Sequence, residues 1–386
     1  MNKVVAIMGL QYGSEAKGSI AGALARNWQP DTVATAWGPN AGHTVREGDF
    51  KFVSTMLATG ALYPSVRTIL IGPGSVVDFL KLAEEVERAG DRLRGKYLII
   101  HPQAAYLKGT NQHDEKHLLR IGSTMKGTAA AVIDKMHRDE RAVARGAPEH
   151  FTDPLLMVAS KVGLHVSFSE KLYDTAIDES EKLAIEGAQG FSLGMHGQFY
   201  PYCTSREVSI TQLLADTRMP MMGYKDRLAI IGVIRTYPIR VANRRGAEGQ
   251  EYTSGGFYED QHELDWRALG REPELTTVTK LPRRVFTFSH EQIYKAVRLI
   301  KPTALALTFC DYIEEAPSDA LGPLHTGERV HRLIQAIRET SNRANHDVEV
   351  ASVSYGPDMT DIYGVLTDDG KLDRSPFSLE KWGGEE

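Results

Sequence analysis

The sequence predicts an α/β fold in which one large domain, residues 1–386, surrounds a mostly parallel central sheet with long functional loops and a small hairpin insertion. Short apolar runs rich in Val and Ile alternate with helical stretches along the chain. Such runs suit strands that are buried on both faces, and their alternation with helices favours a parallel sheet. The hydrophobic content of 42% and charged content of 25% are ordinary, so long disordered stretches are not expected.

The individual elements follow from local composition and periodicity. Clusters of apolar and β-branched residues predict strands at residues 4–8, 68–71, 97–100, 183–185, 228–233, 304–307 and 348–353. An alanine-rich segment that extends to residue 25 predicts a helix behind the first strand, and helical periodicity is clearest at residues 78–89, 290–299 and 328–344. Residues 242–285 are Gly-rich and charged with little periodicity, so they are expected to form loops or a hairpin.

The composition argues against several classes of protein. The formal net charge of -5 does not suit a chain that grips nucleic acid, because that task needs an excess of Lys and Arg on one face. The two cysteines, Cys203 and Cys310, have no paired spacing, so neither a disulfide framework nor structural zinc is indicated. Because we find no signal-peptide pattern and no run of about 18 apolar residues, we expect a cytoplasmic protein without a membrane partner.

The loop after the first predicted strand, GLQYGSEAKGS at residues 9–19, is placed like a phosphate-binding loop. Its glycines let backbone N–H groups approach a phosphate, and Lys17 offers a positive charge for a β- or γ-phosphate. The spacing is not that of a Walker loop, because Gly13 is followed by SEAKGS. Taken alone, a glycine-rich turn with a surface lysine is more often merely a turn.

A second loop, WGPNAGHT at residues 37–44, gathers the polar side chains of Asn40, His43 and Thr44 among small residues. His43 can act as an acid or a base near neutral pH. Taken alone, His43 is better explained as a loop histidine that hydrogen-bonds locally. The other motifs of the chain supply the context that changes this interpretation.

Eight motifs occur in the order GLQYGSEAKGS, GPNAGHT, IGSTMKG, EGAQGFSL, YPYCTS, ELTTVTKLPRR, LTFCD and SYGPD. This order resembles adenylosuccinate synthetase over residues 3–364, and the NAGHT and EGAQG elements are specific to that family. In the family, a nucleoside triphosphate phosphorylates O6 of a purine nucleotide. The amine of L-aspartate then displaces the phosphate to give an N6-succinyl product.

The resemblance implies roles for individual residues. Catalysis would depend on Ser14, Lys17, His43 and Gln189, with His43 donating a hydrogen bond to O6 and Lys17 contacting the transferred phosphoryl group. Mg²⁺ would bind at Ser14 and at the carbonyl of Gly42. The monophosphate would contact Ser14, Asn40, Ser123, Thr124, Arg138, Gln189, Leu193, Thr204 and Val241. The triphosphate would contact Gly13, Glu15, Ala16, Lys17, Gly18, Gly42, His43, Thr44, Asp311, Ser354, Gly356 and Pro357.

Two further segments gain a role from the resemblance. The TTVTKLPRR segment matches the aspartate loop, with Thr277, Val278, Thr279 and Arg283 as the aspartate-binding residues, although such a segment is often an exposed strand. Its Arg283 can clamp a carboxylate in a bidentate fashion. Arg138 would complete the site of a neighbouring subunit, which implies a homodimer. From the charged run DKMHRDERAVAR alone, a solvated helix face is favoured for Arg138.

Three positions depart from the family pattern. Ser14 stands where the family has an aspartate that takes the N1 proton of the purine, and a serine is no effective base without a partner. Leu281 stands where an arginine is usual near the ribose 2′-OH, although Lys280 could occupy that place in space. Phe309 replaces a lysine that packs on guanine, while Asp311 is kept, so ATP or dATP becomes plausible as the energy donor.

These departures resemble a phage-encoded branch of the family, which makes 2-amino-2′-deoxyadenylosuccinate from dGMP, L-aspartate and ATP on the way to diaminopurine DNA. We therefore predict a ligase that joins L-aspartate to C6 of dGMP, with ATP or dATP as co-substrate and Mg²⁺ as cofactor. A small hydroxyl at Ser14 leaves room for the 2-amino group of guanine. The alternatives are an ordinary synthetase that uses GTP and IMP, and an inactive nucleotide-binding homologue.

Overall fold

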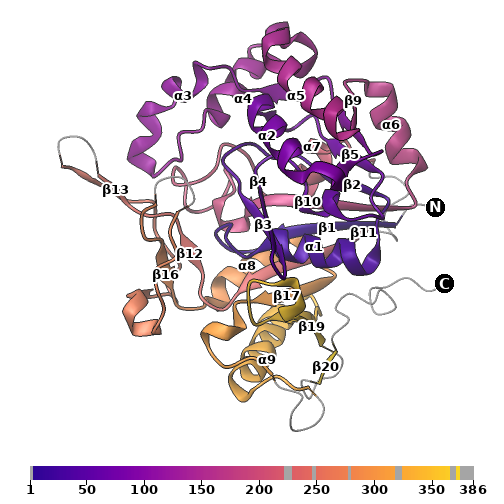
Figure 1. Ribbon diagram of the computed structural model, residues 1–386. Coiled ribbons are helices and arrows are strands. Elements are labelled where there is room, and N and C mark those ends of the chain that lie inside the picture. Colours follow the sequence, from indigo (N-terminus) through magenta and orange to yellow (C-terminus); the bar gives the residue numbers. More distant parts are fainter. Residues whose placement is uncertain are drawn as a thin grey trace.

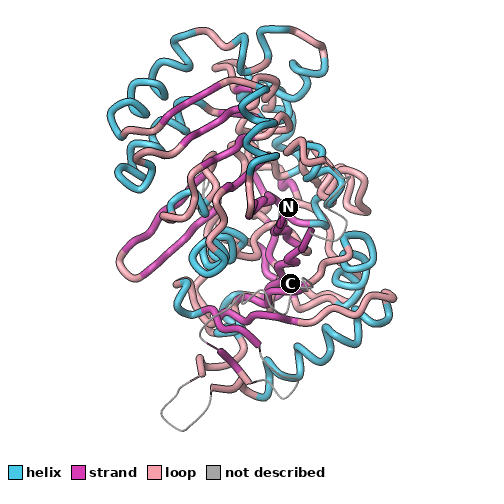
Figure 2. The backbone as a smooth tube through the Cα atoms, turned by 90° about the vertical axis from the view of Figure 1, so that its right-hand side faces the viewer, coloured by secondary structure: helices cyan, strands magenta, loops and turns pink. Residues whose placement is uncertain are grey.

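A central sheet of eleven strands organises the computed structural model, which describes residues 3–220, 228–245, 249–276, 280–317, 324–365 and 371–373. The strands follow one another through the middle of the molecule, with helices around them (Figure 2). Their order across the sheet is β20 (Leu372–Asp373), β19 (Ile362–Val365), β18 (Val350–Ser354), β17 (Ala304–Thr308), β11 (Leu228–Arg235), β1 (Lys3–Gly9), β10 (Lys182–Gly190), β2 (Thr32–Thr35), β5 (Thr68–Ile71), β7 (Tyr97–Ile100) and β9 (His165–Ser167).

All neighbouring strands from β18 to β9 run parallel, and the last two, β19 and β20, are antiparallel. The prediction of a mostly parallel sheet is therefore confirmed. The parallel strands place the loops after β1, β2, β10, β11, β17 and β18 at one edge of the sheet. This is the edge at which α/β proteins bind their ligands.

Both faces of the sheet are covered, and β1 shows how. Successive side chains of a strand point to opposite faces. Val5 and Ile7 belong to one hydrophobic core, while Val4, Ala6 and Met8 belong to a second. The run of apolar residues that predicted this strand is thus the signature of a strand buried on two sides.

Seven of the described helices contribute to one of the two cores, while Ala131 of α4 belongs to a smaller separate cluster. Leu24 of α1 lies in the first core with residues of α2 and α5, and Ile293 of α8 lies in the second with residues of α6, α7 and α9. Figure 1 shows α2, α5 and α6 toward one end of the molecule and α9 toward the other. The helices are α1 (Lys17–Trp28), α2 (Phe79–Ala89), α3 (Asn111–Asp114), α4 (Thr128–Met136), α5 (Glu149–Val162), α6 (Glu170–Glu179), α7 (Ile210–Asp216), α8 (His290–Ile300) and α9 (Glu328–Arg343).

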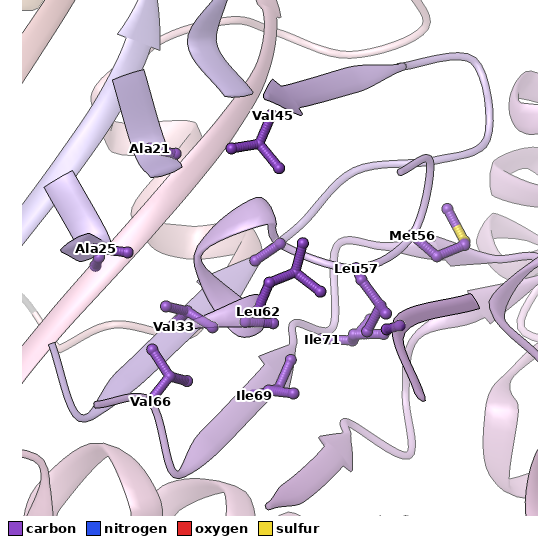
Figure 3. Packing of buried hydrophobic residues seen from close by; sticks show 14 of the residues in the cluster. Ala21, Ala25, Val33, Val45, Met56, Leu57, Leu62, Val66, Ile69 and Ile71 are labelled. Atoms are coloured by element: carbon purple, nitrogen blue, oxygen red, sulfur yellow. The ribbon is translucent and has the colours of Figure 1, made fainter. Parts of the chain in front are cut away.

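Close packing between α1 and the sheet fixes the start of the chain. Figure 3 shows part of the first core, in which side chains of α1, β2, β3 and β5 meet the segment that precedes β5. The labelled residues are Ala21, Ala25, Val33, Val45, Met56, Leu57, Leu62, Val66, Ile69 and Ile71. Because Ala21 and Ala25 are small, α1 can pack close to these side chains.

Four small sheets lie outside the central one. They are β12 (Ile239–Arg240) with β16 (Arg284–Phe286) and β15 (Glu263–Leu264), β13 (Arg244–Arg245) with β14 (Glu251–Tyr252), β3 (His43–Glu47) with β4 (Phe50–Ser54), and β6 (Val76–Val77) with β8 (Ala105–Tyr106). The predicted insertion at residues 242–285 contains the hairpin of β13 and β14, which projects from the molecule in Figure 1. Within the described residues, no helix has the length and apolar character needed to cross a bilayer.

Two local predictions need correction. The strand predicted at residues 183–185 is the nine-residue β10, which continues through the polar residues Glu186 and Gln189. The charged run around Arg138 is not one solvated helix face, because α4 ends at Met136 and Arg138 adopts a φ of 63° in the turn that follows. A non-glycine residue with positive φ cannot continue a right-handed helix.

Candidate active site

A cavity of about 770 Å³ opens at the carboxyl edge of the sheet. It unites residues from segments far apart in sequence, as expected when parallel strands end side by side. The sequence-predicted residues that line it are Gly13, Ser14, Asn40, Gly42, His43, Ser123, Thr124, Gln189, Leu193, Thr204, Val241 and Arg283.

The loop between β1 and α1 is held by one buried carboxylate. Glu15 accepts hydrogen bonds from the backbone N–H groups of Gln11, at 3.1 Å, and Gly13, at 2.7 Å. Its other oxygen lies 2.9 Å from Nζ of Lys17, and both side chains are buried. Gly13 has a φ of 98°, which explains why the loop needs glycine at that position. The ion pair holds Lys17 beside the loop rather than out in solvent.

The first turn of α1 leaves backbone donors free for an anion. Its N-cap residue, Ala16, offers no side-chain cap, and the first turn carries no acidic residue. Unsatisfied N–H groups and the helix dipole together favour a phosphate at such an end. A Cβ on Gly18 would lie 2.9 Å from Cβ of His43, so glycine permits the close approach of α1 to His43.

His43 is oriented by a carboxylate that the sequence did not single out. Nδ1 of His43 lies 2.6 Å from Oε1 of Glu186, and both side chains are buried. Glu186 also accepts hydrogen bonds from the backbone N–H of Thr59, at 2.7 Å, and from its hydroxyl. The ring of Trp37 packs on the imidazole with 4.3 Å between centroids. The buried carboxylate therefore fixes both the tautomer and the orientation of the imidazole.

Ser14 lies between two arginines. Its hydroxyl accepts a hydrogen bond from Nη1 of Arg283 at 2.9 Å, and its carbonyl accepts one from Nη1 of Arg235 at 2.9 Å. Burial lowers the pKa of Arg283, although the carboxylate of Glu274 opposes that shift. In the family, a carboxylate would occupy the place of the Ser14 hydroxyl. The structure therefore puts the unusual serine in direct contact with the arginine expected to bind aspartate.

A second set of contacts, centred on Arg235 next to Ser14, gives a structural reason for the phenylalanine at position 309. The ring of Phe309 packs on the buried guanidinium of Arg235, with 3.7 Å from Cζ to the ring centroid. Arg235 also pairs with Glu274 at 2.5 Å, and Tyr312 donates to the same carboxylate at 2.9 Å. Burial alone raises the pKa of Glu274, but Arg235 outweighs it and holds this pKa below its usual value. A lysine in place of Phe309 would face the positive charge of Arg235.

The other expected triphosphate residues lie outside the cavity but at the same edge of the sheet. Asp311 follows β17 and lies 3.6 Å from Arg271. Burial raises the pKa of Asp311, although Arg271 opposes the shift. Ser354 ends β18 and donates to the carbonyl of Gly356 at 3.0 Å, directly before Pro357. Thr308 ties β17 to the first loop by donating to the carbonyl of Glu15 at 3.0 Å.

Arg138 is not among the residues that line this cavity, and neither are the predicted residues Glu15, Ala16, Lys17, Gly18 and Thr44. Arg138 is exposed, and its backbone N–H donates to the carbonyl of Lys135 at 2.9 Å, but within the described residues its side chain makes no hydrogen bond or ion pair. Thr277, Val278 and Thr279 lie outside the described residues. The base of their loop is present, because Leu281 donates its backbone N–H to the hydroxyl of Thr276 at 3.1 Å. Neither Lys280 nor Leu281 lines the cavity, so neither takes the place of the missing arginine there.

No group of three or more His, Cys, Asp or Glu side chains could hold a metal ion in the parts of the chain that the structure describes. With so few protein ligands, Mg²⁺ could bind at this site only if phosphate oxygens supply most of its ligands, as is common for that ion. The carbonyl of Gly42 fits such a role at the cavity wall. The Ser14 hydroxyl fits less well, because it already faces the guanidinium of Arg283.

The sequence interpretation missed three residues of this site. Glu186 belongs to the EGAQG motif, but from this motif only Gln189 was predicted to have a role in the site. Arg235 is the last residue of β11 and Arg240 is the last residue of β12, and both are almost fully buried. A buried charge needs partners, so arginines that close apolar strands were the available signal. Burial lowers the pKa of Arg240 to about 10, although the neighbouring Tyr12 opposes the shift.

Comparison with known proteins agrees with this geometry. The family model for adenylosuccinate synthetase matches residues 6–153 and 143–318. The chain is similar to N6-succino-2-amino-2'-deoxyadenylate synthase of Salmonella phage PMBT28, with 38% identity over 93% of this chain and 97% of that protein.

Two solved structures have the same fold. One is the succinoaminodeoxyadenylate synthetase of cyanophage S-2L bound to dGMP and dATP, at 35% identity, with a TM-score of 0.79 over 95% of this chain and 97% of that one. The other is adenylosuccinate synthetase of Plasmodium falciparum, with a TM-score of 0.71 over 94% of this chain and 99% of that one. At 20% identity, this second likeness concerns the fold alone. The chain thus belongs to the adenylosuccinate synthetase family.

Proposed function

We propose that the chain joins L-aspartate to C6 of dGMP, using ATP or dATP. O6 of the guanine attacks the γ-phosphorus, the bond to the leaving diphosphate breaks, and the N1 proton is lost. The aspartate amine then bonds to C6 as the C6–O6 bond breaks and inorganic phosphate leaves. The amine loses a proton, and the product is 2-amino-2′-deoxy-N6-succinyladenylate. The similarity to the phage synthases and to the cyanophage structure with dGMP and dATP supports this choice.

Ser14 carries the choice of dGMP over IMP. Guanine differs from hypoxanthine by an amino group at C2, beside N1. The Ser14 hydroxyl lines the cavity, and it can accept a hydrogen bond from that amino group. Arg283 already donates to this hydroxyl, which leaves one acceptor site for the base. A carboxylate would be bulkier and would attract Arg283 more strongly.

His43 is proposed to stabilise charge on O6 during phosphoryl transfer. Its Nδ1 is engaged by Glu186, so Nε2 is the ring nitrogen available to the cavity. The Glu186 carboxylate would stabilise the imidazolium, in which both ring nitrogens donate. Lys17 and the free N–H groups of the first turn of α1 would hold the γ-phosphoryl group, because they meet at the same loop.

Arg283 is the proposed ligand for a carboxylate of aspartate. It lines the cavity beside Ser14, close to where C6 of the purine would lie. A guanidinium can bind a carboxylate through two parallel hydrogen bonds. Its side chain donates to the hydroxyl of Ser14 and to the carbonyl of Leu275, and a carboxylate of the substrate would readily replace such neutral acceptors. Thr277, Val278 and Thr279 remain predicted partners in this subsite.

The co-substrate and cofactor are proposed from the same edge of the sheet. Asp311 would accept from the amino group of the triphosphate base, next to the Phe309 ring that covers Arg235. Mg²⁺ would neutralise the β- and γ-phosphates, with Gly42 as its protein ligand. The residues of this chain then orient the triphosphate and exclude water from the transferred group.

We further propose a homodimer completed by Arg138. Its side chain is exposed beside α4, whose Ile133 and Met136 are 50% and 72% exposed. Apolar residues on one helix face next to an unengaged arginine suit an interface with a second copy. In such a dimer the guanidinium would reach the phosphate of the neighbouring nucleotide.

One assay tests this function against its rivals. The protein is incubated with Mg²⁺, L-aspartate and each pairing of dGMP, GMP or IMP with ATP, dATP or GTP, while phosphate release and succinylated product are followed. We expect turnover with dGMP and an adenine triphosphate. Turnover of IMP but not dGMP would contradict the proposal and favour an ordinary synthetase. Absence of turnover with every pair would favour an inactive binding protein.

A further inference from the structure

The hairpin of β13 and β14 is attached to the loop that carries Ser123 and Thr124. Nη2 of Arg244 donates to the carbonyl of Ser123 at 3.1 Å. The backbone N–H of Ser254, just after the hairpin, donates to Oδ1 of Asn243 at 2.9 Å and so fixes its base. Arg244 lines the cavity together with Ser123 and Thr124. Its guanidinium therefore contacts the backbone of the segment whose two hydroxyls, on Ser123 and Thr124, are expected to bind the 5′-phosphate.

Arg244 is poorly satisfied for an arginine in this position. A guanidinium has five N–H donors. Among all residues that the structure describes, the Ser123 carbonyl is the one hydrogen-bond acceptor of the Arg244 side chain, which has no ion pair there. The side chain of Arg244 is partly buried, and this burial lowers its pKa, because part of its hydration is lost with no counterion in return. A bound dianion would supply that counterion.

The surroundings of Arg244 are cationic. Arg120 and Lys126 also line this end of the cavity, and no ion pair is found for either among the residues described. The nearby carboxylate of Glu115 is occupied by backbone donors, including the N–H of Gly127 at 2.7 Å. Positive charge that is not neutralised by the protein raises the local concentration of an anionic substrate.

We propose that Arg244 binds the 5′-phosphate of the deoxynucleotide from within the same subunit, and so makes the enzyme select a nucleotide over a nucleoside. This inference rests on the proposed function, because it takes dGMP as the ligand. The hydroxyls of Ser123 and Thr124 would supply neutral donors, and Arg244 would supply the charge. The hairpin would thereby be fixed against the phosphate loop when the site is filled.

A purely structural role for Arg244 makes a different prediction. If the side chain only fastens the hairpin to Ser123, a neutral residue that can still donate to the carbonyl should serve equally well. Arg244→Gln keeps a donor but removes the charge, whereas Arg244→Lys keeps the charge. Arg245 is a matched control, because it lies next on the hairpin, is exposed and pairs with Glu251 at 3.0 Å.

The test compares Arg244→Gln, Arg244→Lys and Arg245→Gln with the unaltered protein. The KM for dGMP is measured at saturating ATP and L-aspartate, and calorimetry measures the binding of dGMP and of deoxyguanosine. We expect Arg244→Gln to raise the KM for dGMP and its dissociation constant by about 10- to 100-fold, the usual effect of losing a charge-assisted contact. Arg244→Lys should lose less, and Arg245→Gln should match the unaltered protein.

The nucleoside decides between the two roles. Binding of deoxyguanosine should be the same in Arg244→Gln and in the unaltered protein, because the nucleoside has no phosphate. Equal weakening of dGMP and deoxyguanosine would overturn the proposal in favour of a structural role, as would unchanged dGMP binding. If the unaltered protein binds dGMP but does not turn it over, the proposed function fails, while the calorimetry still decides the role of Arg244.

Discussion

Replacing Ser14 by aspartate restores the carboxylate usual in the family and tests the reasoning about the base edge. The hydroxyl of Ser14 lies 2.9 Å from Nη1 of Arg283, so a carboxylate at this position would form an ion pair with that arginine. The guanidinium already makes the bond to Ser14 charge-assisted, so a carboxylate adds the attraction between two opposite charges. At this partly buried position that attraction is roughly 0.5–2 kcal/mol, and it would have to be overcome whenever Arg283 turns to the substrate.

We therefore expect Ser14→Asp to raise the KM for L-aspartate by roughly 2- to 30-fold, as that free-energy difference implies. The ratio of kcat/KM for dGMP to that for IMP should fall, because the carboxylate crowds the 2-amino group. Steady-state rates of phosphate release with each substrate varied in turn give both quantities. Ser14→Asn is the control, since it is similar in size to aspartate but neutral.

Two results would refute this reasoning. An unchanged KM for aspartate in Ser14→Asp would mean that Arg283 does not have to leave position 14 to bind substrate. An unchanged ratio of dGMP to IMP would mean that Ser14 does not recognise the base edge. If Ser14→Asn reproduces the effect on the KM for aspartate, size rather than charge is responsible.

Three further predictions concern other residues. Glu186→Gln removes the carboxylate that orients His43, so kcat for dGMP should fall by roughly 10- to 100-fold with little change in KM; equal changes in both would show a general loss of structure. Cys203 lines the cavity, whereas Cys310 is fully buried, so mass spectrometry after maleimide treatment should find label on Cys203 alone, and dGMP should block it. If Arg138 completes the partner's site, mixing inactive Arg138→Ala and His43→Ala proteins should restore roughly a quarter of the normal activity. About half of the dimers are then mixed, and each mixed dimer keeps one of its two sites intact. No recovery after subunit exchange would contradict the shared site.

The parts of the fold that could be predicted from sequence are those in which burial is the main constraint. β1, β5 and β7 are apolar runs buried on both faces, and they could be predicted because their side chains serve only to fill the core. β2 escaped prediction because its four residues, TVAT, carry two threonines in a buried strand. The strand β10 was predicted too short, since it carries Glu186 and Gln189 where a strand of purely structural purpose would have apolar residues.

The residues of the site also fall into two groups, those that the sequence could locate and those that it could not. Residues in short motifs, such as Ser14 and His43, could be located because glycine-rich loops are local signals. The partners that orient them could not, because the contacts of Arg235 with Ser14 and Glu274 join residues distant in sequence. Phe309 shows the difference most clearly. From sequence it suggested only a change of triphosphate, whereas the structure shows a ring that covers a buried arginine.

The place of β1 at the middle of the sheet has a consequence for synthesis of the chain. Its two neighbours are β10 and β11, which leave the ribosome only after residues 182–190 and 228–235 are translated. At a rate of roughly 5–20 residues per second, this first strand waits on the order of ten seconds or more for partners. An apolar segment of this kind is a target for chaperones and for misassembly during that interval. The loop at residues 9–19, which follows β1, therefore cannot reach its final conformation until most of the chain exists.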